Sequence, residues 1–267
     1  ASQWNLYRAQ KALQEVAREH DVEFCFFHGR GGTVSRGAGP IHRFLEAMPK
    51  GAMQGAFRMT EQGETIARKY ANFATAVYNL ELQLASTTAA TLLSRNKSDD
   101  DESVLALMQG LSDISQKTYQ SLIRDPEFIR FYHQVTPIDV LQHARIGSRP
   151  AKRTGQSSIE DLRAIPWVFS WNQSRFYLPS WYGVGTALHT LAEQNPKAFE
   201  TLRTTISDIK LLNYILNNVE TTVASANAEI MQWYAGLIRE PDLRERFMGQ
   251  ILAELDLTSR MLVAVYG

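Results

Sequence analysis

The sequence predicts a mainly α-helical fold with a few buried parallel strands, which we interpret as part of an α/β, TIM-like barrel surrounded by many helices. Apolar residues recur at helical spacing along most of the chain, almost without a break from Lys197 to Val265. Only three short apolar runs resemble strands, and these are too few to close a sheet. The first run leads into a glycine-rich loop, and the end of a strand is where α/β enzymes place their chemistry. The strand candidates are residues 22–27, 56–59 and 165–171.

The helices follow from apolar spacing and from the proline and glycine residues that mark their ends. Residues 1–20 form an amphipathic helix, and Pro40 suits the first turn of a helix that runs through Met48. The polar and basic stretch 144–158 is predicted to be a mobile loop. The apolar positions of the first helix are Leu6, Ala9, Leu13 and Val16. Further helices are expected at 66–93 with a break near Asn72, at 102–124, at 126–135, briefly after Pro137, after a turn at Pro179, Gly183 and Gly185, and from the starts Asn195-Pro196 and Glu240-Pro241.

Composition excludes several classes of protein. Apolar residues make up 44% of the 267 residues, which is ordinary for a globular chain and too many for a disordered one. The formal net charge is zero, so we expect neither nucleic acid nor a membrane as a partner. The single cysteine, Cys25, excludes a disulfide framework and a cysteine metal site, and it is expected to be a small buried side chain. No run reaches the roughly 18 apolar residues of a membrane span and no signal peptide is visible, so a cytoplasmic location is the default expectation.

The first strand candidate leads into the most informative segment, residues 28–39. These residues hold five glycines, one histidine and two arginines. Glycine lets backbone N–H groups approach an anion, and arginine offers paired donors to phosphate or carboxylate. The chain has no Gly-Lys pair, which excludes a P-loop, and Val34 stands where a dinucleotide fingerprint needs its third glycine. We therefore predict an anion site of another kind. The alternative is a flexible glycine-arginine linker, although such linkers do not follow a buried strand.

A second basic segment supplies further candidates for the same site. Arg149 lies in the stretch 147–153, which holds three cations within five residues, and Arg163 comes just before the third strand candidate. If the strands belong to one sheet, these arginines reach the same cavity as Arg30 and Arg36. Burying so many like charges is costly unless an anion neutralises them, so a phosphorylated acid is the expected ligand. The alternative for the stretch 147–153 is a solvated basic patch.

Several motifs, in this order along the chain, resemble phosphoenolpyruvate carboxylase. The resemblance runs from Ala1 through at least Leu188, and more weakly through the terminal helices. It implies that residues 1–267 are a single piece of the family's carboxyl-terminal catalytic half. In this piece, residues 1–188 are the barrel part with the glycine and arginine loops, and residues 189–267 are a helical part. The motifs that carry the resemblance are Phe27–Val34, Thr60–Glu64, Gly147–Arg153, Leu162–Trp171, Gln173, Arg175 and Leu178–Gly185.

The resemblance implies that phosphoenolpyruvate and bicarbonate give oxaloacetate and phosphate, with Mg²⁺ or Mn²⁺ and without biotin. Bicarbonate attacks the phosphorus to give carboxyphosphate and the enolate of pyruvate, and the enolate carbon then captures CO₂. By resemblance, Arg30 and Arg163 bind the phosphate and Arg149 helps to hold the transferring group. His28 lies beside bicarbonate or carboxyphosphate. The implied catalytic residues are His28, Arg30, Arg36, Arg149 and Arg163, and the implied substrate-binding residues are Arg30, Arg163, Arg149, Gly31, Gly32 and Gln173.

The sequence also departs from the family pattern. Ser35 and Ala38 replace glycines of the loop, while Arg36 is retained. The family's metal carboxylates and another catalytic histidine lie upstream of this segment, and the usual Gln-Asn-Thr-Gly end is missing. We therefore expect an interior piece that has no metal ligands of its own and does not turn over alone. Ser225 stands where many members have the lysine of Ala-Lys-Ala-Asp, which joins the loop arginine in an inhibitory site for aspartate or malate.

The resemblance implies partners as well as chemistry. The remainder of the polypeptide completes the site, and the full-length protein is expected to be a homotetramer. The alternative function is a non-catalytic helical protein, derived from the same fold, that uses the arginines to sense an anion or serves in interactions. A separate chain that supplies the upstream half would favour the enzyme.

Overall fold

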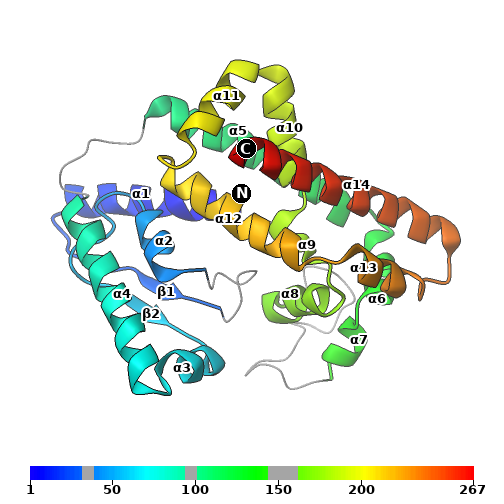
Figure 1. The fold of residues 1–267 in the computed structure, drawn as a ribbon, viewed down its shortest axis with the longest axis horizontal. Coiled ribbons are helices and arrows are strands. Elements are labelled where there is room, and N and C mark those ends of the chain that lie inside the picture. The colour runs from blue at the N-terminus through cyan, green and yellow to red at the C-terminus, as the bar shows by residue number, and fades with distance from the viewer. Residues whose placement is uncertain (32–38, 94–100, 144–161) are drawn as a thin grey trace. The chain divides into compact units, whose positions relative to one another are not determined.

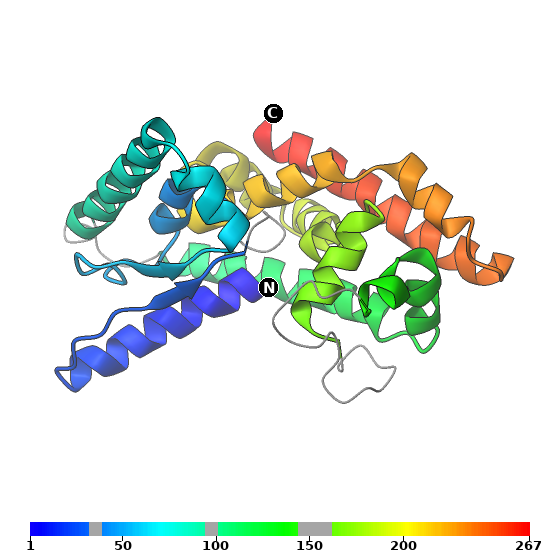
Figure 2. The ribbon, with the colours of Figure 1, turned by 90° about the horizontal axis from the view of Figure 1, so that it is seen from below.

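The computed structural model describes residues 1–31, 39–93, 101–143 and 162–267 (Figures 1 and 2). Among these residues no helix is both long enough and apolar enough to cross a membrane. The chain divides into two compact units, one of residues 1–112 with 204–218 and one of residues 113–203 with 219–267. The elements are α1 (Ser2–Glu19), β1 (Phe27–Gly29), α2 (Ile41–Glu46), β2 (Arg58–Thr60), α3 (Gly63–Tyr70), α4 (Phe73–Leu93), α5 (Glu102–Ile123), α6 (Phe128–Val135), α7 (Ile138–Leu141), α8 (Ala164–Gln173), α9 (Leu178–Trp181), α10 (Val184–Gln194), α11 (Pro196–Thr205), α12 (Lys210–Ser225), α13 (Ala228–Ala235) and α14 (Pro241–Tyr266).

The first unit is built around two parallel strands, as the sequence predicts. Strands β1 and β2 pair in parallel, with His28 opposite Met59 and Gly29 opposite Thr60. Figure 2 shows the strands between α1 (dark blue) and α4 (teal). The expected break near Asn72 is confirmed, because α3 ends at Tyr70 and α4 begins at Phe73. A small apolar core lies beside the strands, and its buried members are Ile41, Leu45, Met48 and Met53.

The first strand is shorter than predicted and begins later. Residues 22–26 have no regular structure, and β1 has only three residues. Val22 is 57% exposed and Phe27 is 66% exposed, and Cys25 is also exposed, so the prediction of a buried strand with a buried cysteine is wrong. The physical reason is that β1 pairs only with β2 among the described residues, so the side chain of Phe27 is left largely exposed. The parallel pairing of the two strands is confirmed.

The second unit packs around a cluster of aromatic side chains. Phe128 of α6, Trp171 of α8 and Phe247 of α14 are fully buried. The ring centroid of Phe128 lies 6.1 Å from that of Trp171 and 5.6 Å from that of Phe247. The hydroxyl groups of Tyr132 and Ser170 form a buried hydrogen bond of 2.8 Å, and burial raises the pKa of Tyr132 above its usual range. These contacts join α6, α8 and α14, which are far apart in the sequence.

Residues 165–171 do not form the predicted third strand but lie in helix α8. A short apolar run fits a buried helix as well as a buried strand, so its periodicity could not separate the two. Pro166 lies in the first turn of α8, where the missing N–H group of proline would have no helical partner in any case. Arg163 is the N-cap residue of this helix. The argument that a shared sheet carries Arg163 toward the glycine loop is therefore wrong.

Helices α10 and α14 approach each other closely because glycine stands at the start of α10. A Cβ atom at Gly185 would lie 2.5 Å from the backbone nitrogen of Thr258 and 2.7 Å from its Cα. Gly183 has a φ of 91°, which favours glycine. The buried carboxylate of Glu254 accepts hydrogen bonds of 3.0 Å from the backbone N–H groups of Gly183 and Thr186. This carboxylate satisfies N–H groups that have no partner within α10 itself.

Replacing Gly185 with alanine is expected to lower the free energy of unfolding by about 1–3 kcal/mol, because the added methyl group must push α10 away from the backbone of Thr258. The matched control is Gly249→Ala within α14, where a Cβ atom meets nothing within 4 Å. That change is expected to be neutral or to stabilise the protein by up to about 1 kcal/mol, since alanine favours the helix. Urea unfolding of both variants measures the difference. A Gly185→Ala variant as stable as the unchanged protein would contradict the close packing of α10 on α14.

Candidate functional site

The candidate site in the first unit lies where the two parallel strands end together. Because Gly29 lies opposite Thr60, the next residues along the chain, Arg30 and Glu61, leave the strands side by side. The backbone N–H of Arg30 donates a hydrogen bond of 3.0 Å to the carbonyl oxygen of Thr60. The carboxyl ends of parallel strands are the usual place for ligand sites in α/β folds. The sequence placed Arg30 at a strand end, and the structure confirms that position.

Arg30 is a buried cation with only 6% of its surface exposed. Its guanidinium group donates a hydrogen bond to the carbonyl oxygen of Gly39, and it lies 5.1 Å from the ring centroid of Phe44. Burial lowers the pKa of Arg30, while Tyr214 and Glu61 raise it. An arginine keeps its proton in proteins despite such shifts, so the site contains a fixed positive charge. Backbone and ring contacts hold this charge in one orientation.

His28 lies two residues before Arg30, on β1. Its ring centroid is 5.3 Å from that of Phe57 in a stacked arrangement and 5.1 Å from that of Phe44 in an edge contact. Burial lowers the pKa of His28, and the positive charge of Arg30 lowers it further, so the imidazole is neutral at neutral pH. The Nε2 atom is buried without a hydrogen-bond partner among the described residues. A buried polar atom without a partner is costly, so this nitrogen is a candidate to bind a ligand.

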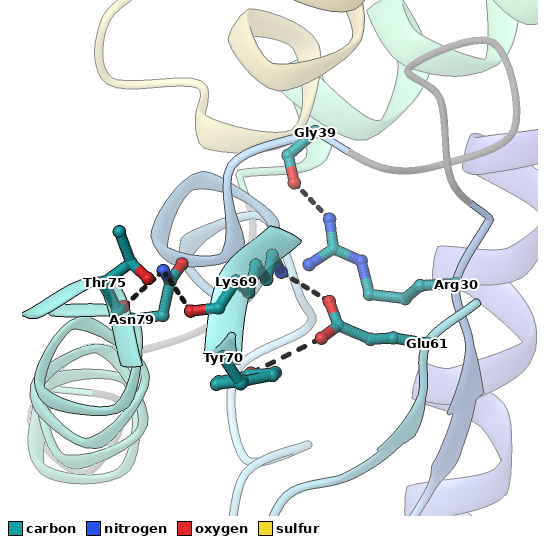
Figure 3. Close-up of polar contacts among 7 residues, drawn as sticks. All are labelled: Arg30, Gly39, Glu61, Lys69, Tyr70, Thr75 and Asn79. Atoms are coloured by element: carbon teal, nitrogen blue, oxygen red, sulfur yellow. Dashed lines mark hydrogen bonds and ion pairs between the residues drawn. The ribbon is translucent and has the colours of Figure 1, made fainter. Parts of the chain in front are cut away.

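A carboxylate that the sequence analysis did not single out joins this site. The side chain of Glu61 is 7% exposed, forms an ion pair with Lys69, and accepts a hydrogen bond of 3.4 Å from the hydroxyl of Tyr70 (Figure 3). Burial raises the pKa of the Tyr70 hydroxyl, and the charge of Glu61 raises it further. Figure 3 shows Arg30 beside Glu61. The sequence contained one signal for this residue, because Glu61 stands directly after the second strand as Arg30 stands after the first.

Helix α3 positions Lys69 and Tyr70 beside Glu61. The chain enters α3 two residues after Glu61, and Lys69 and Tyr70 lie in the last turn of that helix. The side chain of Asn79, on α4, donates hydrogen bonds to the carbonyl oxygens of Lys69, at 3.4 Å, and Thr75, at 2.7 Å (Figure 3). The end of α3 is therefore tied to α4. Sequence spacing did not reveal this arrangement, since it depends on the path of the chain that brings the last turn of α3 to Glu61.

Two further predicted site residues belong to the second unit, at opposite ends of α8. Arg163 is the N-cap residue of α8, and its Nε atom is buried without a hydrogen-bond partner among the described residues. Gln173 is the last residue of the same helix and is exposed. Ten helical residues span about 15 Å, so the structure does not bring these two residues together. A half-buried cationic side chain at a helix N-terminus is well suited to an anion.

The remaining predicted site residues fall largely outside the described part of the chain. Gly31 is the last described residue before the gap. Gly32, Arg36 and Arg149 lie outside the described residues. Their assignment as catalytic or substrate-binding residues stays a prediction.

The described residues do not offer a site for a catalytic divalent metal. Within the described ranges, no three histidine, cysteine, aspartate or glutamate side chains gather where they would hold an ion. The buried carboxylate at the strand ends, that of Glu61, is already paired with Lys69. What the first unit offers is the charge of Arg30 and the neutral imidazole of His28. This combination is suited to bind an anion and to form a hydrogen bond with it.

Comparison with known proteins relates the sequence of this chain to a family. The family model described as phosphoenolpyruvate carboxylase matches residues 1–267. A phosphoenolpyruvate carboxylase of Methylorubrum extorquens is 40% identical over 269 residues, which cover 100% of this chain and 29% of the relative. Those of Thermosynechococcus vestitus and Corynebacterium glutamicum are 39% and 40% identical, and the chain covers 27% and 30% of them. The chain thus spans less than a third of the length of these curated relatives.

Proposed function

This chain belongs to the phosphoenolpyruvate carboxylase family, and we propose that it is part of a longer protein, here called the parent protein, that converts phosphoenolpyruvate and bicarbonate to oxaloacetate and phosphate. The observation that carries the proposal is the buried Arg30 at the joined carboxyl ends of two parallel strands, two residues after His28, whose Nε2 has no hydrogen-bond partner among the described residues. Both residues lie in a segment that matches the family over its whole length.

The proposed reaction makes and breaks bonds in two stages. A bicarbonate oxygen forms a bond to the phosphorus while the bond between phosphorus and the enol oxygen breaks, which gives carboxyphosphate and the enolate of pyruvate. Carboxyphosphate then releases CO₂ and phosphate, and the enolate carbon attacks CO₂ to give oxaloacetate. Negative charge moves among oxygens in each stage. The protein therefore contributes mainly by positioning the reactants and by neutralising charge.

The described residues are suited to particular parts of this reaction. Arg30 is proposed to bind the phosphoryl oxygens, since a guanidinium group pairs two donors with two phosphate oxygens. His28 is neutral, and its Nε2 has no hydrogen-bond partner in the described part of the chain; it is proposed to hydrogen-bond bicarbonate or carboxyphosphate. Arg163 is proposed to reach the same phosphate, and its buried Nε, which no described residue pairs, supports a ligand there. The roles that the family resemblance implies are proposed unchanged for Arg36, Arg149, Gly31, Gly32 and Gln173.

Carboxylases of this family require a divalent metal. The described residues do not supply a cluster of side chains that could hold one. Bound metal would supply charge neutralisation at the substrate oxygens. We propose that the metal ligands come from the part of the parent protein outside residues 1–267, and that the ion is Mg²⁺ or Mn²⁺.

We also propose that the rest of the polypeptide completes a TIM-like barrel. Residues 1–188 would be its barrel part and residues 189–267 a helical part. A homotetramer and a cytoplasmic location are also proposed.

A non-catalytic anion sensor is not favoured as the alternative. The chain aligns over its full length with proteins that are named as the enzyme, at about 40% identity. A protein that only senses an anion would need the arginines but would not need the other motifs of the family.

The shared phosphate site is tested by determining the structure of the parent protein. Guanidinium groups of Arg30 and Arg163 more than about 15 Å apart would contradict a shared site.

The reaction itself is tested on the parent protein with ¹⁸O-labelled bicarbonate. Oxaloacetate formation is expected to depend on both phosphoenolpyruvate and bicarbonate. Because a bicarbonate oxygen becomes bonded to phosphorus, one ¹⁸O atom is expected in the phosphate that is released. Phosphate without label, in the presence of oxaloacetate formation, would overturn the proposed first stage. Absence of oxaloacetate with added Mg²⁺ or Mn²⁺ would overturn the proposed function.

Aspartate and malate are expected to inhibit the parent protein weakly, because Ser225 replaces the lysine of the family's inhibitory site. Ser225 is the last residue of α12, and its hydroxyl donates a hydrogen bond of 2.8 Å to the carbonyl oxygen of Thr221. The lost charged hydrogen bond is worth about 1.5–3 kcal/mol, which is roughly a 10- to 100-fold weakening of inhibitor binding. Ser225→Lys is expected to lower the inhibition constant by that factor in steady-state titrations.

Ser259→Lys is the matched control for this change. Ser259 also lies in a helix and also donates a hydrogen bond of 2.8 Å to the carbonyl oxygen four residues earlier, that of Leu255. Its replacement is expected to leave inhibition unchanged. Strong inhibition of the unmodified parent protein, or no gain from Ser225→Lys, would show that Ser225 does not occupy the lysine position.

A further inference from the structure

One aromatic ring contacts both polar side chains of the candidate site. Phe44 lies on α2, and its ring centroid is 5.1 Å from that of His28, with an angle of 83° between the ring planes. The guanidinium carbon of Arg30 lies over the same ring, 5.1 Å from its centroid. This is within the usual distance of a cation–π interaction. Phe44 therefore joins the imidazole of His28 to the guanidinium group of Arg30.

The beginning of α2 holds Arg30 at two points. The carbonyl oxygen of Gly39 accepts a hydrogen bond from the guanidinium group, and the ring of Phe44, five residues later, lies against the same group. The first turn of α2 fixes the spacing of these contacts, because the backbone N–H of Phe44 donates a hydrogen bond of 3.1 Å to the carbonyl oxygen of Pro40. A single hydrogen bond would leave the guanidinium group free to turn about it. The ring supplies a second restraint.

The ring of Phe44 is itself held in place. It packs against the apolar core of the first unit, in which Ile41 and Leu45 of the same helix are buried. Its centroid lies 6.4 Å from that of Phe57 and 6.1 Å from that of Tyr214 on α12. Close packing on several sides keeps a side chain in one rotamer. The surface that the ring presents to the candidate site is therefore fixed.

The buried charge of Arg30 needs such support. Arg30 has lost most of its contact with water, and this burial lowers its pKa, while the carboxylate of Glu61 raises it. The face of an aromatic ring carries partial negative charge, and it attracts a cation more strongly where water is excluded. An anion then meets a guanidinium group that is already oriented, so little side-chain freedom is lost on binding.

The imidazole of His28 is surrounded by rings. The ring centroids of Phe26, Phe44 and Phe57 lie 6.3, 5.1 and 5.3 Å from its own. None of these three side chains carries a charge, and the charge that acts on His28 among the described residues is that of Arg30. The rings exclude water from the imidazole, and this burial is the larger cause of its lowered pKa.

We propose that Phe44 is a positioning residue, which holds the guanidinium group of Arg30 and the imidazole of His28 in the orientations in which both bind one anion. The proposal rests on the proposed function, because it takes these two residues as the anion-binding pair. Phe44 has no polar side-chain atom and acts only through them. The alternative is that Phe44 merely fills space in the core, in which case any apolar side chain of similar size would serve equally well.

The proposal is tested in the parent protein by changing the charge distribution of the ring while its shape is kept. Position 44 carries phenylalanine, 4-fluorophenylalanine or 3,4,5-trifluorophenylalanine, because each fluorine atom withdraws electron density from the ring face. With a weaker attraction, Arg30 holds its binding orientation for a smaller fraction of the time, and the apparent affinity for an anion falls by that fraction. The dissociation constant of inorganic phosphate, measured by calorimetry, is expected to rise with each substitution, by about 2- to 30-fold over the series.

The same fluorine series at Phe24 is the matched control. Phe24 is a half-buried phenylalanine of the same unit, and its ring makes an edge contact with Phe26, at 4.8 Å between centroids. Phosphate binding is expected to stay unchanged. A constant affinity over the series at position 44, or equal weakening at both positions, would overturn the hold on Arg30. If a fluorinated protein does not fold, Phe44→Leu replaces it, and unchanged phosphate binding in that variant would overturn the proposal.

The hold on His28 is tested with Phe44→Ala, which admits water beside the imidazole. The pKa of His28 is expected to rise toward the usual value of an imidazole, as measured by NMR of ¹³C-labelled histidine, with the signal identified by its loss in His28→Gln. The imidazole then gains its proton at a higher pH, so the fall of kcat/KM on acidification is expected to begin at a higher pH. Phe24→Ala is expected to change neither. An unchanged pKa in Phe44→Ala, or in Phe44→Leu if the alanine variant does not fold, would overturn this part of the proposal.

Oxaloacetate formation, measured on the same samples, separates this proposal from the proposed function. A parent protein that forms oxaloacetate but shows constant phosphate affinity over the fluorine series overturns the positioning role alone. The expected loss of affinity in a parent protein that forms no oxaloacetate overturns the proposed function alone. A parent protein that forms oxaloacetate but binds no phosphate overturns the phosphate site, and the positioning role with it.

Discussion

The 267-residue chain by itself is expected to form no measurable oxaloacetate from phosphoenolpyruvate and bicarbonate, even with excess Mg²⁺ or Mn²⁺. Mg²⁺ is normally held by one or two carboxylates beside the oxygens of its substrate, and no cluster of potential ligands occurs in the described parts of the chain. A catalytic metal supplies several kcal/mol of stabilisation to the transition state, so its loss lowers the rate by about 10³-fold or more. A coupled assay for oxaloacetate measures this.

The control for this experiment must show that the isolated chain is folded. The buried ring cluster around Trp171 and Phe247 gives an asymmetric environment to aromatic side chains, so a near-ultraviolet circular dichroism signal that disappears in urea reports it. The parent protein is assayed in parallel under the same conditions. Oxaloacetate formation by the isolated, folded chain, free of host enzyme, would show that the metal ligands lie within these residues after all.

Replacing Arg30 with glutamine in the parent protein is expected to lower kcat/KM by about 10²–10³-fold. That is the usual loss when one donor that stabilises developing charge on oxygen is removed. Glutamine keeps a hydrogen-bond donor for the carbonyl oxygen of Gly39 but removes the positive charge. Arg30→Lys is expected to recover only part of the activity, since an ammonium group cannot present two parallel donors to a phosphate. Steady-state kinetics with both substrates varied measure these losses.

Arg43→Gln is the matched control for Arg30. Arg43 is an exposed arginine of α2 in the same unit, and it donates a hydrogen bond of 3.0 Å to the side-chain oxygen of Asn217. Its replacement is expected to leave kcat/KM unchanged. Because Arg30 is buried, thermal unfolding of each variant separates loss of chemistry from loss of fold. Full activity in a folded Arg30→Gln variant would exclude Arg30 from the phosphate site.

Part of the candidate site could be predicted from the sequence. The glycine-rich segment after an apolar run identified His28 and Arg30, because strand ends followed by glycine and arginine are a local pattern. Glu61 and its contacts with Lys69 and Tyr70 escaped prediction, because they depend on the parallel register of two strands and on the path of α3. The order of residues along the chain does not by itself show such contacts.

The sequence by itself determined the helices and the family of this protein. Apolar spacing and helix-ending residues located long helices such as α5 and α14, because a helix is held by contacts between residues three and four positions apart. Long motifs in a conserved order identified the family, which the match over residues 1–267 confirms.

Only the tertiary structure decided which faces and which elements meet. The run 165–171 is helical in the structure, where the ring of Trp171 packs against Phe128 of α6, although the periodicity of the run fits either state. The apolar stripe of α1 turned outward because Trp4 and Tyr7 anchor another face. Periodicity determines which side chains share a face of a helix, whereas the neighbours available in space determine which face is buried.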